Sequence, residues 1–547
     1  MQTTLVNIIG FILKVGLIPS ALFFLVPADP DITRDFVSNM LSSAGIILGL
    51  MGVIYAELML LRFGDGRSHF ARHPDRLVDV GMYARTRHPY HWFLSLYHFG
   101  IFIHFYQVSS PAILLGAIYF FGGLVFLIIY QEKQLTTLGT SYESYRKSTP
   151  AWFWSLNIPE NHKVMVLPQL IWVFGRIVLK MWYRIRVTGK EHIPHNKSFL
   201  MVANHESYID PFLFGIFVPF DIQFVTTADV FTNRFMNFLL KGVGTFPMRR
   251  HRQDLRSIRT MIRMINEGRT VCIFPEGGRS FDGSPLRIVD ETVKLIQRCK
   301  VPILPVQISG AYEIWPRWAP NRRRSQFSAH FQPVIPVEDQ SDLNELRKRI
   351  QKAIFPENRE FTATRSSFMV KGLDRFIWAC VSCHTHHSIH IASTNSIACS
   401  HCGINWEMDD KYLLHSSEGE TTTLINWVEH IDSTIRTNPL KTPLTQELSP
   451  GETAYLAAPI KAYHTDEGEF LQNDLELILS DQRFILSRSG KVLHEWEISL
   501  VTVLTLDFDR AVSIGYGGVR HRFLLQDSDI PFKWRSYYQV LTGKAAN

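Results

Sequence analysis

Apolar residues are unevenly distributed along the chain, and this unevenness divides it into parts. The first part contains long apolar runs, each close to the roughly 20 residues that a helix needs to cross a bilayer. These runs cover residues 4–26, 40–61, 92–108 and 111–130. The pattern predicts an α-helical membrane bundle of about four spans within residues 1–157.

The charges between the apolar runs predict an orientation. Segment 62–91 carries six arginines, whereas segment 27–39 carries three aspartates and one arginine. Arginine-rich loops stay preferentially on the cytoplasmic side of a membrane. We therefore expect an integral membrane protein whose termini, and every domain after residue 131, face the cytoplasm.

Strand-like and helical patterns alternate over residues 158–360. Short β-rich runs flank a stretch with apolar residues at helical spacing, from Leu255 to Ile265, which Gly268 ends. The strand-like runs are Phe199–Ala203, Ile222–Thr227, Thr270–Phe274 and Ile303–Ile308. This alternation predicts an α/β domain, in which ligands usually bind where the strands end.

Four of the six cysteines form two Cys-x-x-Cys pairs within residues 370–412. Such spacing is typical of a metal site rather than a secreted disulfide framework, and it favours a reducing cytosol. The cysteines Cys380, Cys383, Cys399 and Cys402 resemble a zinc ribbon, in which four thiolates hold a structural Zn²⁺. Gly403 suits the tight turn after the second pair. Free thiols or a redox pair are the alternatives.

Strand-like runs resume in residues 447–547, after an expected helix and linker over 413–446. The runs are Ala454–Leu456, Leu475–Leu479, Arg483–Ser487, Val501–Phe508 and Phe523–Leu525, and a helical stretch near Phe532–Leu541 follows them. A β-rich module closed by a helix resembles pleckstrin-homology-like and GRAM-like lipid-binding domains. The resemblance implies a lipid ligand but assigns no ligand residues.

Composition adds to this multi-domain picture. A chain of 547 residues is too long for one hydrophobic core. Its formal charge of +7 and pI of about 9.0 indicate anionic partners, first among them lipid head groups and phosphorylated substrates. Trp315 and Trp318 beside Arg322–Arg324 predict a surface that contacts anionic membrane lipid. No nucleic-acid module is recognised, so no nucleic-acid partner is expected.

A histidine and an aspartate five positions apart, His205 and Asp210, are the candidate catalytic pair. Histidine can take a proton from a hydroxyl near neutral pH, and a carboxylate can fix its tautomer and stabilise the imidazolium. Five residues of a regular helix turn through about 500°, so the side chains can meet only in a turn leading into a helix. Asp210 and Pro211 are typical of a helix N-cap and first helical position. A plain capping turn is the alternative, and it is compatible with the catalytic interpretation.

The loops around this pair give a family resemblance. Residues 165–335 resemble the glycerolipid acyltransferases, which include lysophosphatidate acyltransferases. Phe246 and Arg249 match the family's Phe-x-x-Arg, and Glu276 and Gly277 match its Pro-Glu-Gly, with Arg279 completing the turn. The resemblance implies that these five residues bind substrate, with Arg249 on the acceptor phosphate. Gly278 departs from the family, which often has a hydroxyl residue there.

The function implied is transfer of a fatty acyl group from acyl-CoA or acyl-carrier protein to the hydroxyl of a lysophospholipid. The expected acceptor is 1-acylglycerol 3-phosphate, which would become phosphatidate. His205 would act as general base and Asp210 would orient it. Acyl-carrier protein and membrane lipid are the expected partners besides the substrates.

Residues 45–155 resemble a second family, the integral-membrane methyltransferases of isoprenylcysteine carboxylates and phospholipid amines. Arg87, His88 and Pro89 match its Arg-His-Pro stretch, and Glu132 matches its acidic stretch. The resemblance implies that these four residues hold S-adenosylmethionine. The chain departs from that family where Gln131 replaces a glutamate. A basic collar that anchors a helix end at the lipid surface is the alternative interpretation.

Two other functions therefore stay open beside acyl transfer. One is S-adenosylmethionine-dependent lipid methylation, either alone or together with acylation on one chain. The other is a non-catalytic membrane scaffold that binds lipid. A scaffold with inactive catalytic domains predicts degraded motif loops, and the acyltransferase loops are intact whereas the methyltransferase loops are partly altered.

Overall fold

The computed structural model divides the chain into two compact units. Unit 1 comprises Met1–Val178 and Ile216–Asp221, and unit 2 comprises Leu179–Gly215 and Ile222–Asn547. The residues described are 36–63, 77–106, 112–136, 140–152, 155, 172, 175–176, 178–194, 198–215, 217–218, 220–227, 237, 240, 245–248, 255–357, 359–437, 439, 448–507, 511–526 and 529–544.

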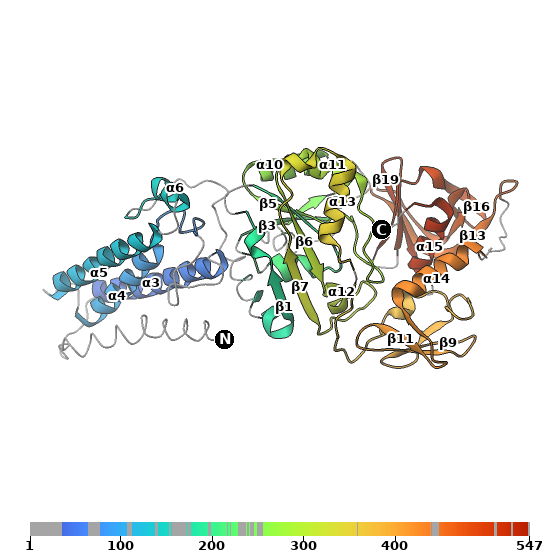
Figure 1. Ribbon diagram of the computed structural model, residues 1–547, viewed down its shortest axis with the longest axis horizontal. Helices are drawn as coiled ribbons and strands as arrows, with labels where there is room; N and C mark the ends of the chain where they lie inside the picture. The colour runs from blue at the N-terminus through green and yellow to red at the C-terminus, as the bar shows by residue number, and fades with distance from the viewer. Residues whose placement is uncertain are drawn as a thin grey trace. The chain divides into compact units, whose positions relative to one another are not determined.

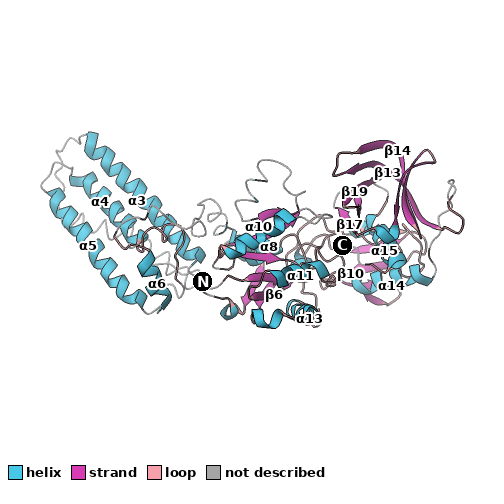
Figure 2. Ribbon diagram, turned by 90° about the horizontal axis from the view of Figure 1, so that it is seen from above, coloured by secondary structure: helices cyan, strands magenta, loops and turns pink. Residues whose placement is uncertain are grey.

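Unit 1 is a helical bundle. Its long helices α3 (Phe36–Phe63), α4 (Pro89–Tyr106) and α5 (Ala112–Leu135) lie side by side, and the short helix α6 (Thr140–Ser148) follows them (Figures 1 and 2). Glycines allow α3 and α4 to approach closely. A methyl group on Gly45 would lie 2.9 Å from the Cα of Gly100, so larger side chains would push the helices apart.

The bundle supports the membrane prediction in part. Among the described residues, one helix, Phe36–Leu60, is long and apolar enough to cross a bilayer, with a mean hydropathy of 1.9. A buried core helix of a soluble protein can pass the same test. The first expected span, residues 4–26, lies outside the described residues. The four-span topology and its cytoplasmic orientation stay predictions.

Unit 2 begins with a mixed seven-stranded sheet in the order β1-β7-β6-β2-β5-β3-β4 (Figure 1). Its strands are β1 (Arg184–Thr188), β2 (Leu200–Ala203), β3 (Ile222–Thr227), β4 (Thr245–Met248), β5 (Thr270–Ile273), β6 (Ile303–Ser309) and β7 (Gln326–Phe331). The pair β6–β7 is antiparallel, and the other neighbouring pairs are parallel. The predicted α/β fold is confirmed, and each of the four expected strands is present.

Helices α10 (Leu255–Asn266), α11 (Asp290–Arg298) and α13 (Leu343–Ile354) share one core with the sheet. The sheet residues Leu200, Val202, Val271, Ile273 and Ile303 contribute to that core. They alternate along β2 and β5, as expected when one face of a strand meets the helices. Asp342 caps α13 by accepting from the backbone N–H groups of Asn344 and Glu345.

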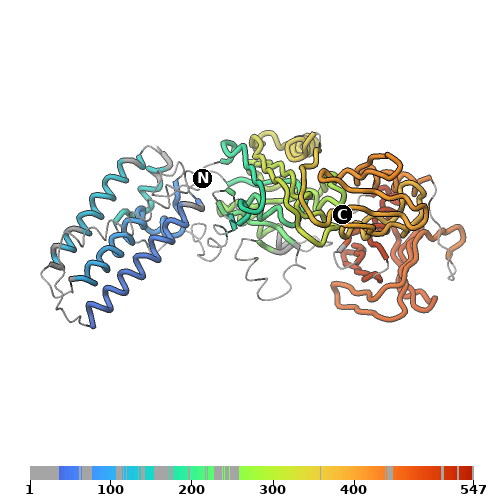
Figure 3. The backbone as a smooth tube through the Cα atoms, turned by 90° about the horizontal axis from the view of Figure 1, so that it is seen from below, coloured from blue at the N-terminus to red at the C-terminus, as the bar shows by residue number. Residues whose placement is uncertain are grey.

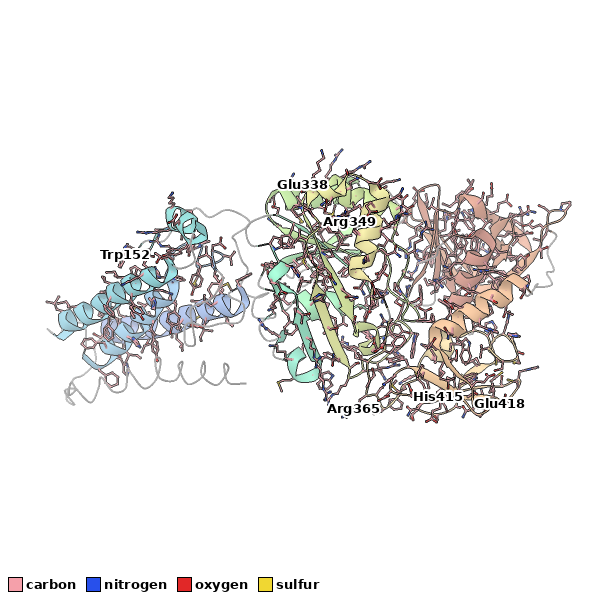
Figure 4. All side chains as sticks on the ribbon, in the orientation of Figure 1. Trp152, Glu338, Arg349, Arg365, His415 and Glu418 are labelled. Carbon is pink, nitrogen blue, oxygen red and sulfur yellow. The ribbon has the colours of Figure 1, made fainter. Side chains whose placement is uncertain are left out.

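Charged residues cover the outer side of these helices. Glu338 in the 3-10 helix η6 (Val337–Gln340) and Arg349 on α13 lie on this surface (Figure 4). Arg349 pairs with Asp339 at 2.7 Å, with both side chains exposed. Helix α10 covers the periodic stretch predicted from Leu255 to Ile265, and its Met261 and Ile265 are buried in the shared core, so the helix prediction is confirmed.

A five-stranded antiparallel sheet follows, in the order β12-β11-β10-β9-β8. Its strands are β8 (Ile389–Ile391), β9 (Ser396–Cys399), β10 (Asn405–Met408), β11 (Leu413–Ser416) and β12 (Thr421–Thr423), and helix α14 (Leu424–Thr437) comes next. Figure 3 follows the chain from the α/β domain through this sheet to the last one. Trp406 and Trp427 are fully buried between the sheet and α14.

The C-terminal sheet has seven antiparallel strands in the order β16-β15-β14-β13-β19-β18-β17. Its strands are β13 (Ala454–Thr465), β14 (Phe470–Ser480), β15 (Arg483–Arg488), β16 (Lys491–Glu497), β17 (Val503–Asp507), β18 (Ala511–Tyr516) and β19 (Val519–Leu525), closed by helix α15 (Pro531–Thr542). The β-rich prediction is confirmed. The pleckstrin-homology-like assignment stays a prediction.

The C-terminal sheet packs on the α/β domain. The ring of Phe281 lies 5.2 Å from that of Phe532 on α15, measured between centroids. Arg317 donates to the backbone carbonyl of Leu506 at 2.6 Å. One continuous buried cluster joins Phe281 and Tyr312 to both later sheets. The loops of the α/β domain are therefore held by later parts of the chain.

Candidate active site

The turn after β2 brings the predicted pair together. His205 Nδ1 lies 2.7 Å from Asp210 Oδ2, and the imidazole is 17% exposed while the carboxylate is fully buried. The loop stands at the carboxyl end of β2, between β5 and β6, which both run parallel to it. The carboxyl ends of these three strands share one edge of the sheet, where ligands of α/β domains usually bind.

Asp210 organises the turn as well as the histidine. Its Oδ2 accepts from the backbone N–H groups of Glu206 and Ser207 at 2.8 and 2.9 Å. The N-cap prediction is therefore wrong, because the carboxylate accepts from the loop that precedes the helix and not from the first turn of the helix. Helix α8 (Asp210–Gly215) begins at Asp210 itself, and the carbonyl of Ile209 accepts from its first turn. The carboxylate points back at the loop because the loop N–H groups have no strand partner.

Glu276, from the loop after β5, fixes the backbone of His205. Its Oε1 accepts from the His205 N–H at 2.6 Å, and its Oε2 accepts from the Leu286 N–H at 2.8 Å. Gly277 has φ +65°, a conformation that costs an L-residue with a side chain about 1–2 kcal/mol. The Glu-Gly sequence therefore makes the sharp turn that aims the carboxylate at the histidine loop.

Burial dominates the electrostatics of the two carboxyl groups. It raises the pKa of Asp210 to about 7, while the Ser207 and Glu206 N–H groups and the charges of Arg279 and Arg359 act in the lowering direction. Burial also raises the pKa of Glu276 to about 8. The imidazole of His205 stacks on Phe274 with ring centroids 4.1 Å apart, which fixes its plane.

Arg279 lies beside this loop. Its guanidinium stands 3.1 Å above the centroid of the Tyr208 ring, and the residue is 8% exposed. The structure thus places Arg279, predicted to bind substrate, next to the turn that carries His205. It supplies a positive charge near the buried carboxylate of Asp210.

Of the two residues that match Phe-x-x-Arg, the structure describes Phe246 but not Arg249. Phe246, on β4, is buried and packs in the helix-covered core. Its aromatic ring therefore contributes to packing rather than to an exposed binding surface. Arg249 lies outside the described residues, so its predicted contact with phosphate is not addressed.

Sequence reasoning missed a buried ion cluster beside the pair. Arg359 Nη1 donates to Glu206 Oε1, and Nη2 donates to Glu313 Oε2 at 3.1 Å. Glu206 is 3% exposed and Glu313 is 1% exposed. Buried charges of this kind are stable only when paired. The only signal in the sequence was Glu206 itself, a charged residue directly after His205 and close to the apolar run Phe199–Ala203.

Asn204 was missed as well. Its side-chain amide donates to the Ile308 carbonyl at 2.8 Å, and its carbonyl accepts from the Ile308 N–H at 2.7 Å. The amide thereby continues the pairing of β2 with β6 by one residue. It sets the position from which the His205 turn departs.

The predicted lipid-facing stretch is only partly exposed. Arg323 is buried and donates to the Tyr412 hydroxyl, and Trp318 donates to the Tyr312 hydroxyl at 2.9 Å. Arg323 was expected on the surface, so that part of the prediction is wrong, while Trp318 is half-buried. Arg322 and Arg324 are exposed, and Arg324 lies 4.3 Å from the ring centroid of Trp182. The backbone of Arg365, labelled in Figure 4, pairs with that of Arg324.

The four cysteines predicted to bind metal form one cluster. The sulfur atoms of Cys380, Cys383, Cys399 and Cys402 all lie within 4.8 Å of one another. Two of the Sγ–Sγ distances are 3.8 and 3.6 Å. Tetrahedral zinc with Zn–S bonds of about 2.3 Å separates its sulfurs by about 3.8 Å, so the donor set fits Zn²⁺.

The backbone of the cysteine cluster also suits a metal site. The residue after each pair, His384 or Gly403, has positive φ, +59° and +78° respectively. Its N–H donates to the carbonyl of the first cysteine of the pair at 3.1 or 3.0 Å. The two Cys-x-x-Cys turns therefore share one conformation. The glycine at 403 is used as expected, while the first turn accommodates a histidine there.

The residues predicted to hold S-adenosylmethionine meet at one end of the unit 1 bundle. Arg87 Nε and His88 Nε2 lie 2.8 and 2.7 Å from the same oxygen of Glu132. His88 Nδ1 lies 2.7 Å from Gln131 Oε1. Pro89 is the first residue of α4. The glutamine that departs from the family thus satisfies the buried histidine.

Comparisons with known proteins address the middle of the chain. Residues 184–309 match the Acyltransferase family. This segment runs from β1 to the end of β6 and contains the His205 turn and the Glu276 loop. The match and the names of similar proteins support an acyltransferase, and they leave the methyltransferase question open.

Several relatives are 1-acyl-sn-glycerol-3-phosphate acyltransferases. The one from Bacillus subtilis is 28% identical over 136 residues, covering 25% of this chain and 67% of the relative. The one from Chlamydomonas reinhardtii is 23% identical over 229 residues, covering 38% of this chain and 68% of the relative. The one from Borreliella burgdorferi is 31% identical over 141 residues, covering 24% of this chain and 55% of the relative. The chain thus spans about two thirds or less of these relatives' lengths.

A solved structure is also similar. It is the crystal structure of the 1-acyl-sn-glycerophosphate acyltransferase from Thermotoga maritima, 23% identical in sequence. The match covers 44% of this chain and 90% of that protein, with a TM-score of 0.31.

Proposed function

We propose that the α/β domain transfers a fatty acyl group from an acyl thioester to the hydroxyl of 1-acylglycerol 3-phosphate, giving phosphatidate. The observation that carries this proposal is the His205–Asp210 pair at the carboxyl edge of the sheet, with Nδ1 turned toward the carboxylate. An imidazole that donates from Nδ1 has its lone pair on Nε2, which is the proton acceptor that alcohol activation needs.

The chemistry balances without a covalent acyl-enzyme. His205 Nε2 takes the hydroxyl proton as the acceptor oxygen bonds to the thioester carbonyl carbon. The C–S bond then breaks, and the leaving thiolate receives the proton from the imidazolium. Asp210 stabilises that imidazolium, and its fixed position keeps the tautomer correct through the cycle.

Arg249 and Arg279 are proposed to hold the phosphate of the acceptor. A guanidinium binds phosphate through two parallel hydrogen bonds, which suits a charged head group. The placement of Arg279 beside Tyr208 supports its part of this role. The donor is proposed to be acyl-CoA or acyl-carrier protein, and parallel assays with each would separate them.

Membrane lipid is the proposed surrounding of the site. Met181 is 82% exposed and Trp182 is 53% exposed, and the exposed Arg324 lies beside Trp182. Exposed aromatic and basic side chains together suit the surface of an anionic bilayer. The candidate span Phe36–Leu60 and the lipid substrates named for the relatives support the same setting.

The decisive experiment is replacement of the proposed base. His205→Ala should lower acyl transfer to 1-acylglycerol 3-phosphate by about 10²–10⁴-fold, because general-base catalysis contributes that much. His192→Ala, on the same domain and partly exposed, is the matched control and should keep full activity. Labelled acyl-CoA and lysophosphatidate in detergent micelles provide the assay. A His205→Ala protein as active as the control would refute the proposal.

A second proposed activity is S-adenosylmethionine-dependent methylation in unit 1. The meeting of Arg87, His88 and Glu132 at the bundle end is the observation that favours it. When bound, the cofactor would supply an electrophilic methyl group, while Glu132 and His88 would orient its polar end. Calorimetric titration of the full chain with S-adenosylmethionine tests it. Without binding, unit 1 would be an anchor whose polar cluster joins helix ends.

A structural zinc ion is proposed for the cysteine cluster. The four thiolates would complete its coordination, so the ion would hold the two turns together and take no part in acyl transfer. A non-catalytic lipid scaffold remains the alternative to both activities. The intact His205, Asp210 and Glu276 geometry argues against it, because a scaffold has no need of an oriented base.

A further inference from the structure

A buried arginine from beyond the family segment contacts the loop of the proposed base. Arg359 follows α13, outside residues 184–309, and its side chain is 12% exposed. Its two terminal nitrogens donate to two different carboxylates, those of Glu206 and Glu313. A planar guanidinium is suited to this fork, whereas an ammonium group would not span both.

The two glutamates hold further backbone groups in place. Glu206 Oε2 accepts from the Ala311 and Tyr312 N–H groups at 3.0 and 3.1 Å, just beyond the end of β6. Glu313 Oε1 accepts from the Thr362 N–H at 3.1 Å. Two carboxylates thus meet one guanidinium and three N–H groups, so that each charge has an opposite charge in a cluster that water hardly reaches.

The cluster connects directly to the His205–Asp210 pair. Glu206 is the residue after His205, and its N–H donates to the same Asp210 oxygen that faces the imidazole. The positive charge of Arg359 also favours the ionised form of Asp210. A shift of Glu206 would therefore change both the position of the loop and the charge of the carboxylate.

We propose that Arg359 is a positioning residue for acyl transfer, which fixes the His205–Asp210 turn through the side chain of Glu206. This inference rests on the proposed function. It means that the site is completed by a segment C-terminal to the family match at residues 184–309. Arg359 itself touches no substrate.

The tests compare two replacements of Arg359 with one control. Arg359→Met removes the charge and the fork. Arg359→Lys keeps the charge without the fork. Arg365→Met, at an exposed arginine of the same segment, is the control and should match the unmodified protein. We expect Arg359→Met to lower kcat by about 10²-fold with little change in KM for lysophosphatidate, because misplacement by about 1 Å costs that much.

The pH profile separates positioning from simple support of the fold. The charged and titratable groups that face Asp210 are His205, Glu206, Cys272, Glu276, Arg279 and Arg359. Losing the Arg359 charge should move the acidic limb of the kcat profile to higher pH. Arg359→Lys should restore that limb while kcat stays about tenfold low, since geometry and charge are then separated.

A charge-neutral variant guards against failure to fold. Arg359→Met leaves two buried carboxylates unpaired, so Arg359→Met combined with Glu206→Gln and Glu313→Gln removes all three charges together. We expect this triple variant to melt near the parent and still have a low kcat. If neither Arg359→Met nor the triple variant folds, the kcat of Arg359→Lys is the test. A kcat equal to that of the parent overturns the inference.

The outcomes distinguish this inference from the proposed function. If His205→Ala is inactive while the folded Arg359 variants keep the parent kcat and pH profile, Arg359 has only a structural role and the inference is wrong. If His205→Ala is fully active, the proposed function fails first, and the positioning role fails with it.

Discussion

The replacement Asp210→Asn tests the balance between catalysis and stability at the proposed site. The amide has the size of the carboxyl group but never carries its charge. We expect acyl transfer to fall by about 10³-fold, because a neutral amide cannot stabilise the imidazolium that forms when His205 takes the proton. We also expect the variant to be at least as stable as the parent at pH 8.

The magnitude follows from the pKa of Asp210, which burial raises from 3.8 to about 7. The shift of about three units corresponds to roughly 4 kcal/mol, at 1.36 kcal/mol for each unit. A carboxyl whose pKa is raised by folding costs no stability below its unfolded pKa. The cost grows as the pH rises toward 7 and is then complete. Asparagine removes this cost.

The amide gives up something in return. Its oxygen takes the place of Oδ2, where it still accepts from His205 Nδ1 and from the Glu206 and Ser207 N–H groups, but these bonds lose the charge of the carboxylate. A hydrogen bond to a charged group contributes about 1.5–3 kcal/mol and one to a neutral group about 0.5–1.5 kcal/mol, so losing the charge on the bond from His205 costs roughly 1–2 kcal/mol. The net gain for the variant is therefore about 2–3 kcal/mol at pH 8 and smaller at pH 5.

The assay is thermal unfolding of both proteins in the same detergent at pH 5 and pH 8, beside acyl transfer at pH 8. A variant that melts several degrees below the parent at pH 8 would refute the reasoning, since the partners of the carboxylate would then outweigh its burial. Activity within a few-fold of the parent would show that Asp210 does not orient the base.

Three other changes test neighbouring features. Glu276→Gln leaves one oxygen for the His205 and Leu286 N–H groups, so we expect a stability loss of about 1–3 kcal/mol and a lower kcat, measured by unfolding and acyl transfer. Gly277→Ala should cost about 1–2 kcal/mol because of its φ of +65°, again read from unfolding, and an unchanged midpoint would contradict the turn geometry. Elemental analysis should find about one zinc per chain; Cys399→Ser should lose it and melt earlier, whereas Cys299→Ser, in the α/β core, should retain it.

Strands with continuous apolar runs could be predicted from the sequence, and more polar ones could not. β2 and β5 are buried along their whole length, so their runs are apolar and bounded by turns. β16 has mostly exposed or half-exposed residues, including Lys491 and His494, and shows no such run. β18 contains Ser513 and Gly515, whose β propensity is low. Both were missed because the packing of neighbouring strands, which the sequence does not display, makes them strands.

Some residues of the site could likewise be predicted from the sequence, and others could not. His205 and Asp210 are five residues apart, so turn geometry alone limits how they can meet. Glu206 and Arg359 are 153 residues apart, and an ion pair has no sequence period that would connect them. The N-cap prediction for Asp210 was wrong because a carboxylate can accept from the preceding turn as well as from the following one. Only the coordinates show which N–H groups lack another acceptor.

The buried carboxylates at this edge of the sheet perform one shared task. Asp210, Glu276 and Glu206 each accept two backbone N–H groups from the loops that follow β2, β5 and β6. The backbone N–H groups of loops that leave the sheet have no neighbouring strand to accept their hydrogen bonds. Side-chain carboxylates accept these hydrogen bonds instead.

This arrangement concentrates negative charge where an anionic substrate is proposed to bind. Arg279 and Arg359 offset part of that charge, and burial raises the pKa of Asp210 and Glu276 toward neutrality. Both effects reduce the field that a phosphate would meet. The charge of Arg279 therefore makes the carboxylates of the loop compatible with an anionic substrate. A protein that loses Arg279 should bind an uncharged acceptor analogue better, relative to the phosphate, than the parent does.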